Sequence, residues 1–558
     1  MTGFLFVFFC LTGKELAAEG NILWTGGYLL RILSVSLLAG GTGGSALCFG
    51  MYRLASGGNS RKREAAKLRK LPGGAVFGGS FLLLVLGWLP GYLAYYPAIC
   101  TYDSPIQVGQ IGENAFIDHH PIAHTLLIKG AMSLGRGILG SVNRGIGVYA
   151  MLQLLLLASV FAFGIWRLYE HGIRPLWLLS LLVLLMVYPF NAYLSISVTK
   201  DTVFSAFFVL QVLSIYELLY KDSRARRVTW RELLFFCSTV GMMLFRNNGK
   251  YAFLVFSGVL AVMVLFGRQS RKQSGKLLVW SAAGFLAGNV ALAALFGLTN
   301  ARQGDKREML SMPIQQLARC MIYHGGAGAL PEDDDTMEEA DKALIRDFIL
   351  DEGYREYDPA ISDPVKRHTN TYVVRYRLKE FASTYFRLLG RYPGDFVNAA
   401  LAVDAGYLYP GDVTHAYVNT GQGLEGMGYV QTRWSEDVFA GYGIYKDSKW
   451  EWLHERMERW ADENAYLNIP VLRYLFMPGI WVWLYLLLFG WLVVRKAYGR
   501  CLPLALILGY YATLLLGPVV QLRYIYPLMA AFPFAFLMSI CDRNVEPPGR
   551  RDEKDDDR

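Results

Sequence analysis

The 558-residue sequence has little charge and none of the usual signatures of a soluble enzyme. Asp, Glu, Lys and Arg make up 18% of the residues, whereas soluble globular proteins have roughly 25%. Hydrophobic residues, at 53%, gather in runs of about 17–25 residues, the length with which an α-helix crosses a bilayer. These features exclude a soluble enzyme, a coiled coil, a disordered chain and a disulfide-stapled secreted domain.

Cysteine is equally sparse. The seven cysteines include no CxxC pair and no zinc-ligand spacing, and the sequence has no Walker, Rossmann or zincin motif. Most cysteines lie in or beside apolar runs, where a free thiol behaves as a small hydrophobic group. Cys100 and Cys320 share one side of the topology given below, so a disulfide between them and two free thiols are both open.

What the sequence has instead is a series of apolar segments, and these predict an all-α polytopic membrane protein with about 11–12 transmembrane helices. The first segment is short and is kept as a span, with a signal-peptide core as the alternative. The spans are expected near residues 3–13, 27–51, 74–97, 146–166, 176–192, 201–220, 232–247, 251–267, 277–299, 470–494, 502–520 and 524–541.

The distribution of Lys and Arg predicts the orientation of these spans. Four short connections are basic, and the span count places all four on one face, which the positive-inside rule makes cytoplasmic. They are residues 53–70, 221–231, 268–276 and 495–500.

Two long segments, 98–145 and 300–469, then lie on the outer face. The second has 28 acidic and 19 basic residues, whereas the rest of the chain has 18 acidic and 36 basic residues. The overall net charge of +9 is therefore a topology signal and gives no reason to expect nucleic acid.

The predicted organisation follows from these spans. A transmembrane bundle (1–299) carries a catalytic first outer loop (98–145). A mainly helical extracytoplasmic domain (300–469), with helices expected at 336–350, 365–389 and 449–465, is inserted before the last three helices (470–541). A charged cytoplasmic tail (542–558) ends the chain.

The first outer loop concentrates ionisable groups in an otherwise apolar chain. Asp103 follows a span directly, at the membrane boundary, where a carboxylate is costly without a partner or a task. Gln107 lies one helical turn beyond Asp103, and Asp118, His120 and His124 follow. The alternative is that Asp103 and Asp118 cap two short helices.

A metal is the one cofactor that this loop suggests. His120 and His124 have the i, i+4 spacing of helical metal ligands, and Asp118 is nearby. Two histidines and one Asp make an incomplete site, so the sequence establishes no cofactor and leaves a divalent cation as a candidate.

Three further polar clusters lie at the outer ends of spans. They are Lys200-Asp201, Arg246-Asn247 and Arg523. Cations at one outer depth would bind a lipid phosphate through charge-assisted hydrogen bonds. The alternatives are a helix cap at Asp201, an ordinary turn at Asn247 and unspecific phospholipid contacts.

These residues carry a resemblance to a known family. The first outer loop resembles that of GT-C superfamily membrane glycosyltransferases, and in particular bacterial relatives of the protein mannosyltransferase and aminoarabinose transferase group. The HPP motif is reduced here to His120-Pro121-Ile122, and the acidic pair to Asp103-Ser104. A closer similarity is to uncharacterised bacterial GT-C-like proteins, through Asp-Ser-x-x-Gln, His-Pro, Thr-Lys-Asp, Phe-Arg-Asn-Asn-Gly and Arg-Tyr-x-Tyr-Pro.

The resemblance implies a glycosyltransferase of the bacterial plasma membrane with its active site on the extracytoplasmic side. The implied donor is a polyprenyl-phosphate-linked sugar, and the acceptor is a cell-envelope glycan or lipid. In this interpretation Asp103 is the general base, and Lys200, Arg246 and Arg523 stabilise the departing phosphate. Substrate binding is assigned also to Gln107, His120, Asp201 and Asn247. In-line displacement would invert the anomeric centre.

Two other function classes are alternatives. A flippase or transporter of a lipid-linked or anionic substrate would place ionisable residues inside its spans. An O-antigen-type polymerase or ligase would rely on Arg and His in the late outer segment. The sequence identifies neither the sugar nor the acceptor, and it leaves the oligomeric state open.

Overall fold

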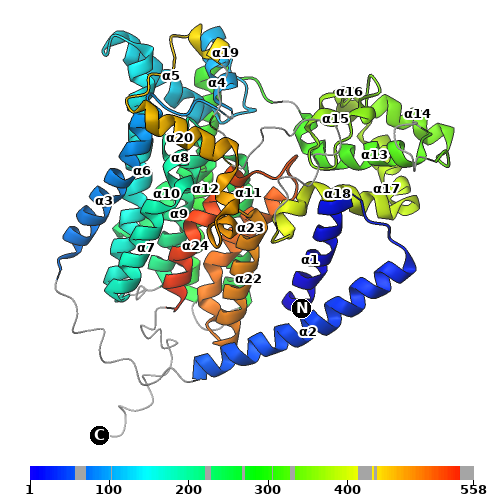
Figure 1. Cartoon of the computed structure of the whole chain (residues 1–558), viewed down its shortest axis with the longest axis horizontal. Helices are drawn as coiled ribbons and strands as arrows, with labels where there is room; N and C mark the ends of the chain where they lie inside the picture. The colour runs from blue at the N-terminus through cyan, green and yellow to red at the C-terminus, as the bar shows by residue number, and fades with distance from the viewer. Residues whose placement is uncertain are drawn as a thin grey trace.

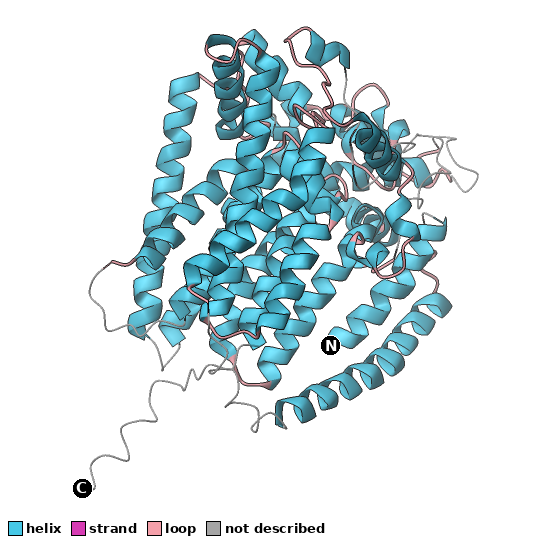
Figure 2. Ribbon diagram, turned by 60° about the vertical axis from the view of Figure 1, so that its left-hand side comes forward, coloured by secondary structure: helices cyan, strands magenta, loops and turns pink. Residues whose placement is uncertain are grey.

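The computed structural model describes residues 1–19, 21–56, 71–101, 103–219, 228–266, 271–304, 306–326, 334–411, 430, 432 and 436–540. Within these residues every regular element is a helix, and the only β-type pairings are isolated bridges (Figure 2). The predicted all-α class is confirmed. Much of the basic connections at 53–70, 221–231 and 268–276, and the predicted tail 542–558, fall outside the described residues.

Each of the predicted spans coincides with a helix of the bundle. The bundle helices are α1 (Thr2–Glu19), α2 (Gly26–Ser56), α3 (Gly73–Ala94), α6 (Val142–Glu170), α7 (Pro175–Val187), α8 (Pro189–Ile196), α9 (Lys200–Leu219), α10 (Trp230–Phe245), α11 (Asn247–Phe266), α12 (Arg271–Thr299), α22 (Pro478–Val494), α23 (Leu502–Leu514) and α24 (Leu522–Ile540).

Seven of the described helices are long and apolar enough to cross a membrane, which confirms a polytopic membrane protein. They are α2, α3, α6, α9, α11, α12 and α24. The pair α7 and α8 would be an eighth span, bent by 56°. The larger predicted count stays a prediction, because α10, α22 and α23 have only 16, 17 and 13 residues.

The break between α7 and α8 has a local cause. Tyr188 has extended backbone angles and Pro189 follows it, so the helix ends before a residue that cannot donate a backbone hydrogen bond. Asn191 Nδ2 donates to the Leu185 carbonyl at 2.8 Å and so satisfies one acceptor at the break. The bend directs α8 toward the end of the bundle where α9 begins.

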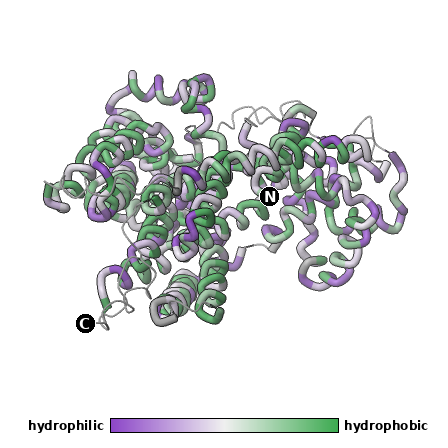
Figure 3. Tube along the Cα trace, turned by 90° about the horizontal axis from the view of Figure 1, so that it is seen from below, coloured by the Kyte–Doolittle hydropathy of each residue, from purple (hydrophilic) through white to green (hydrophobic). Residues whose placement is uncertain are grey.

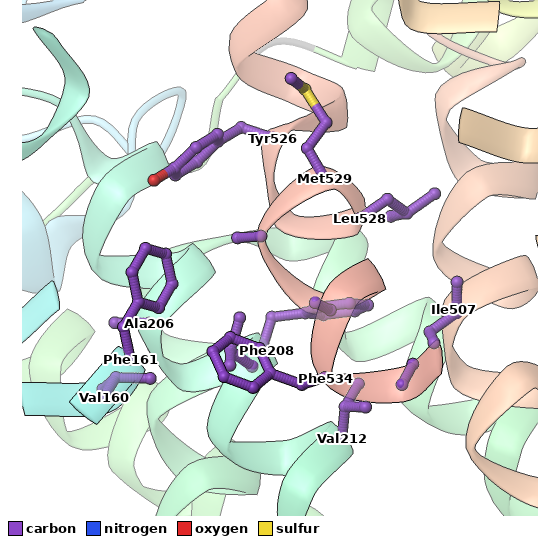
Figure 4. Close-up of a cluster of buried hydrophobic side chains, with 14 of the residues drawn as sticks. Val160, Phe161, Ala206, Phe208, Val212, Ile507, Tyr526, Leu528, Met529 and Phe534 are labelled. Carbon is purple, nitrogen blue, oxygen red and sulfur yellow. The ribbon is translucent and has the colours of Figure 1, made fainter. Parts of the chain in front are cut away.

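The core of the bundle lies where α6, α9 and α24 meet, with α9 largely enclosed by its neighbours (Figure 4). Phe161, Phe208 and Phe534 are fully buried there. Gly164 of α6 is required at this crossing, because a Cβ atom on it would lie 2.4 Å from the Phe534 ring. The buried faces position the first turns of α9 and α24, which carry candidate site residues.

The segments 98–145 and 300–469 lie at the same end of the bundle (Figure 1). They contain α4 (Ser104–Glu113), α5 (Ile122–Gly137), η3 (Lys306–Leu310), α13 (Ser311–His324), α14 (Glu339–Phe348), η4 (Gly353–Glu356), α15 (Asp363–Arg367), α16 (Thr371–Tyr376), α17 (Leu378–Arg391), α18 (Pro393–Leu408), α19 (Glu436–Ala440), α20 (Glu451–Asp462) and η6 (Ala465–Asn468). The short helices α21 (Leu472–Leu475) and η7 (Tyr498–Cys501) complete the elements of the described residues.

The 300–469 segment divides into two parts. Residues 314–396 have an apolar cluster of their own, and the helices around it mix hydrophilic and hydrophobic residues, as Figure 3 shows. By contrast, Tyr407, Ala461 and Tyr466 belong to the core cluster of the bundle. These residues of the second part are therefore packed directly on the membrane helices.

One predicted helix of this segment, 365–389, is wrong as a single element. It consists of α15, α16 and α17. The side chain of Asn370 accepts a hydrogen bond from the Tyr372 N–H at 3.2 Å and starts a new helix, which interrupts the apolar periodicity.

The N-terminal helix covers the weak first span and continues beyond it to Glu19. After α1, Asn398 Nδ2 donates to Asn21 Oδ1 at 2.8 Å, and Trp24 Nε1 donates to Asn398 Oδ1 at 2.7 Å. The connection between α1 and α2 is therefore fixed to α18.

Cys100 and Cys320 are buried free thiols in separate apolar clusters, so they do not form a disulfide with each other.

His324 links three parts of the 300–469 segment. Its Nδ1 lies 3.1 Å from Asp334 Oδ1 and its Nε2 lies 2.8 Å from Asp395 Oδ2. The hydrogen bond to Asp395 is the main cause that raises the pKa of His324 above its ordinary value of 6.5. Arg319 donates to the same Asp395 and also to Asn21, so the network reaches the N-terminal hairpin.

This network predicts a pH-dependent stability. Because folding raises the pKa of His324, its contribution is fully present below the unfolded value of about 6.5 and is lost as the pH rises through the folded value. Thermal unfolding in detergent micelles should therefore show the wild type losing stability, relative to His324→Gln, as the pH rises above about 6.5. Parallel curves for the two proteins would refute a charged His324.

The shared end of the bundle gives a test of sidedness. Ile138 follows α5 and is 78% exposed, whereas Tyr498 lies between α22 and α23 and is 61% exposed. A membrane-impermeant thiol reagent should label Ile138→Cys in intact cells, and should label Tyr498→Cys only after permeabilisation. The unmodified protein gives the background from native cysteines. Labelling of Tyr498→Cys alone in intact cells would invert the predicted orientation.

Candidate functional site

A cavity of about 750 Å³ opens at the end of the bundle that carries α4 and α15. Its bundle side contains most of the predicted site residues, namely Asp103, His120, Lys200, Arg246, Asn247 and Arg523. Its other side is formed by η3, α15 and the connection between α23 and α24. Segments that are far apart in the sequence therefore share one polar chamber.

Asp103 is the carboxylate at the centre of this chamber. It occupies the N-cap position of α4, but its side chain makes no capping hydrogen bond. Instead Lys200 Nζ donates to Asp103 Oδ2, and Arg523 donates from Nη1 to Oδ2 at 2.9 Å and from Nη2 to Oδ1 at 3.2 Å. The capping alternative therefore does not describe this side chain.

A second carboxylate, Asp201, lies beneath the first. It is fully buried in the first turn of α9 and accepts hydrogen bonds from Arg246 Nη1 and, at 3.1 Å, from Arg523 Nη1. Thr199 Oγ1 also donates to Asp201, at 3.1 Å. Arg523 therefore bridges the two carboxylates, and Asp201 forms its ion pairs with the arginines.

Aromatic faces complete the surroundings of the two arginines. The Cζ atoms of Arg246 and Arg523 lie 4.4 Å and 4.7 Å from the centroid of the Tyr524 ring, and Arg246 also faces Tyr510 at 5.9 Å. A buried guanidinium is stabilised by such rings in addition to its carboxylate partners. The sequence showed Tyr524 only as a neighbour of Arg523 and gave no sign of this contact.

Electrostatics keep Asp103 ionised. Burial alone would raise the pKa of its carboxyl, but the positive charges of Arg523 and Lys200 outweigh burial and hold the pKa well below its usual range. The same surroundings favour the neutral form of His120, because burial is the main cause that lowers the pKa of its ring to about 3. His120 is therefore a neutral side chain, with Nδ1 at 3.3 Å from Lys200 Nζ.

Because an ammonium group only donates, Nδ1 of His120 accepts this hydrogen bond and its proton resides on Nε2. Nε2 is buried and has no hydrogen-bond partner in the described part of the chain. His120 therefore positions Lys200 beside Asp103 and lines the cavity without a charge of its own.

Gln107 does not line the cavity and is fully buried behind it. Its Nε2 donates to Thr125 Oγ1 at 2.8 Å, and its Oε1 lies 2.9 Å from His124 Nδ1. His124 Nε2 in turn lies 2.7 Å from the Tyr149 hydroxyl. This chain of hydrogen bonds ties α4 to α5 and α6, so Gln107 orients the helix that begins at Asp103.

The candidate metal ligands do not come together. Asp118 accepts a hydrogen bond from the Gly304 N–H and so joins the first outer loop to residues 301–304. Both ring nitrogens of His124 are engaged elsewhere, and His120 faces Lys200. Within the described ranges no three His, Cys, Asp or Glu side chains are grouped as ligands.

Asn247 lines the cavity at the exposed N-terminus of α11, directly after Arg246. The neighbouring Asn248 Nδ2 donates to Thr513 Oγ1 at 3.0 Å and fixes this turn to α23.

Sequence reasoning missed the wall of the cavity that Arg307, Lys366 and the 514–519 connection contribute. The excess of acidic residues in 300–469 concealed these basic side chains.

Comparison with known proteins gives a family match over most of the chain. Residues 111–553 match the model of DUF6020, which is described as a family of unknown function. The chain belongs to the DUF6020 family. The match covers His120, Lys200, Arg246 and Arg523 of this DUF6020 protein, while Asp103 lies just before it. No curated protein and no solved structure matches the chain.

The buried ion pair between Asp201 and Arg246 should contribute to the stability of this DUF6020 protein. Removing one partner of a buried ion pair leaves the other without its counter-ion, so Asp201→Asn should lower the free energy of unfolding by about 3–5 kcal/mol. Adding Arg246→Gln should recover part of this loss, since coupled neighbours are not additive.

Asp363→Asn is the matched control, because Asp363 is a partly exposed partner of Lys366 beside the same cavity. It should cost about 0–1 kcal/mol. Denaturant unfolding in detergent micelles measures all four proteins. An Asp201→Asn variant as stable as the wild type would contradict a structural role for this pair.

Proposed function

We propose that this DUF6020 protein is an integral membrane glycosyltransferase that moves a sugar from a polyprenyl-phosphate donor to a cell-envelope acceptor. The observation that carries the proposal is the meeting of one cavity-lining carboxylate, Asp103, with the cations Lys200, Arg246 and Arg523 at one end of a membrane bundle. The likeness to GT-C enzymes described above supplies the donor class and the extracytoplasmic side of the bacterial plasma membrane.

Sugar transfer needs both the carboxylate and the cations. The acceptor hydroxyl forms a bond to the anomeric carbon of the sugar while the bond from that carbon to the phosphate oxygen breaks. Asp103 accepts the hydroxyl proton, and the phosphate leaves with the electron pair of the broken bond. Lys200, Arg246 and Arg523 stabilise the charge on the leaving phosphate, and attack opposite the leaving group inverts the anomeric centre.

The size and position of the cavity support an enzyme with two substrates. Its bundle side lies level with helix ends, where the phosphate of a lipid is located. On its other side, η3 and α15 contribute the charged residues Arg307, Glu308, Asp363, Lys366 and Arg367. The donor headgroup therefore fits on the bundle side and the acceptor on the side of the 300–469 segment.

A transporter would bind its substrate near the middle of the membrane, between broken helices. The broken pair α7 and α8 lines a smaller cavity of about 310 Å³, but that cavity is almost entirely apolar. The charged side chains gather at the helix ends instead. This distribution favours transfer chemistry over passage of an anionic substrate.

The proposal is tested with cells and with purified protein. Loss of the protein should remove one sugar from an envelope glycan or lipid, detected by mass spectrometry, and the lipid-linked sugar that accumulates then serves as donor in vitro. Asp103→Asn should lower donor turnover by about 10²–10⁴-fold, the usual contribution of a general base.

Glu113→Gln is the matched control, since Glu113 is an exposed carboxylate at the other end of the same helix and should leave turnover unchanged. A fully active Asp103→Asn enzyme would overturn the base assignment. An unchanged envelope with altered transport of a lipid-linked sugar would instead identify a flippase.

A further inference from the structure

The guanidinium group of Arg523 has no hydrogen left for a substrate. An arginine has five N–H donors, and here Nε donates to Gln521, Nη1 donates to Asp103 and Asp201, and Nη2 donates to Asp103 and Tyr524. A phosphate can therefore bind Arg523 only if one of these partners gives way.

Asp103 is the partner that occupies the place suited to a phosphate. It takes two parallel hydrogen bonds from Nη1 and Nη2, at 2.9 Å and 3.2 Å, which is the forked arrangement that arginine makes with phosphate as well as with carboxylate. Lys200 Nζ, a second cation on this side of the cavity, also donates to Asp103. One carboxylate thus holds both cations.

Burial distinguishes the two carboxylates. The side chain of Asp103 is 13% exposed and lines the cavity, whereas that of Asp201 is 0% exposed and lies behind it. Asp201 also accepts hydrogen bonds from Arg246 and Thr199, which fix it in place. If Asp103 leaves, Arg523 and Arg246 keep Asp201 as their counter-ion, so the cations stay where they are.

We propose that Asp103 occupies the phosphate site in the substrate-free protein, and that the donor phosphate displaces it from Lys200 and Arg523. This inference rests on the proposed function for the identity of the donor. A phosphodiester that links a sugar to a polyprenol has one negative charge, as the carboxylate has, so it can take the place of Asp103 as the counter-ion of Lys200 and Arg523. The binding step is an exchange of anions.

The exchange makes the base available only when the donor is present. While Asp103 is held by Lys200 and Arg523 it is a poor proton acceptor, because both cations stabilise its ionised form. Once the phosphate binds these cations, Asp103 is free beside the sugar and next to a second anion, which raises its proton affinity. Donor binding therefore precedes activation of the acceptor hydroxyl, and Asp201 is the positioning residue that holds the cations throughout.

The test measures binding of farnesyl phosphate to the purified full-length protein in detergent micelles by calorimetry. Asp103→Asn removes the competing charge, so the affinity should rise by about tenfold or more, whereas Lys200→Gln should weaken binding. Farnesol, which has the chain without the phosphate, should bind all variants alike. Inorganic phosphate in the same experiment distinguishes a headgroup site from a site that needs the lipid.

Asp363→Asn controls for the general removal of a negative charge, because Asp363 lines the same cavity but pairs with Lys366 instead of the site cations. Its effect on affinity should be much smaller than that of Asp103→Asn. Asp103→Ser, which also lacks the charge and suits an N-cap position, repeats the test if the Asn variant fails to fold.

Unchanged or weaker binding by both Asp103 variants would overturn the exchange, since it would mean that Asp103 supports the phosphate site instead of occupying it. The measurement needs no sugar transfer. Tighter binding in a protein that transfers no sugar would therefore refute the proposed function and leave the exchange standing, whereas sugar transfer with unchanged affinity would refute the exchange alone.

Discussion

The bridge that Arg523 makes between Asp103 and Asp201 is the interaction on which the organisation of the site depends. A guanidinium group at a membrane boundary is stable only with its charge balanced and its donors satisfied. Meeting that requirement brings the first turn of α24 against the start of α4 and the start of α9. The packing of α6, α9 and α24 below it holds these helix ends in register, so the core of the bundle and the polar cluster support each other.

Much of the fold could be predicted because a membrane helix corresponds to one long apolar run in the sequence. Each apolar run is helical, although the run at 176–192 is divided between α7 and α8, and the weak run at the N-terminus became the longer α1. The prediction of a single helix at 365–389 was wrong because Asn370 caps a new helix within this range. A cap depends on one residue, so it is harder to recognise in a sequence than apolar periodicity. The packing of Tyr407 and Tyr466 into the bundle core was not predictable, since nothing local marks which apolar residues of a soluble-looking segment face the membrane helices.

The candidate site likewise has features that the sequence predicted and features that it did not. Asp103, Lys200, Arg246 and Arg523 were found as charges out of place in an apolar chain, and the structure places them together around one cavity. Their pairing could not be predicted, since the sequence presented Asp201 as a substrate-binding residue or a helix cap, and it is instead the partner of Arg246 and Arg523. Gln107 was assigned to substrate because of its spacing from Asp103, yet both ends of its amide are used in holding α4 to α5. Spacing indicates which residues share a helix face and says nothing about the segment that will cover that face.

The separation of Asp103 and Arg523 by 420 residues has a consequence for how the protein is made. At a synthesis rate of about 5–20 residues per second, roughly 20–80 s pass between the two residues leaving the ribosome. During that interval Asp103 and Asp201 lack the cation that bridges them in the finished protein. The cation that completes the polar cluster therefore comes from α24, the last helix among the described residues. Ribosome stalling or premature termination late in the message would therefore leave a chain in which Asp103 and Asp201 are not joined by Arg523.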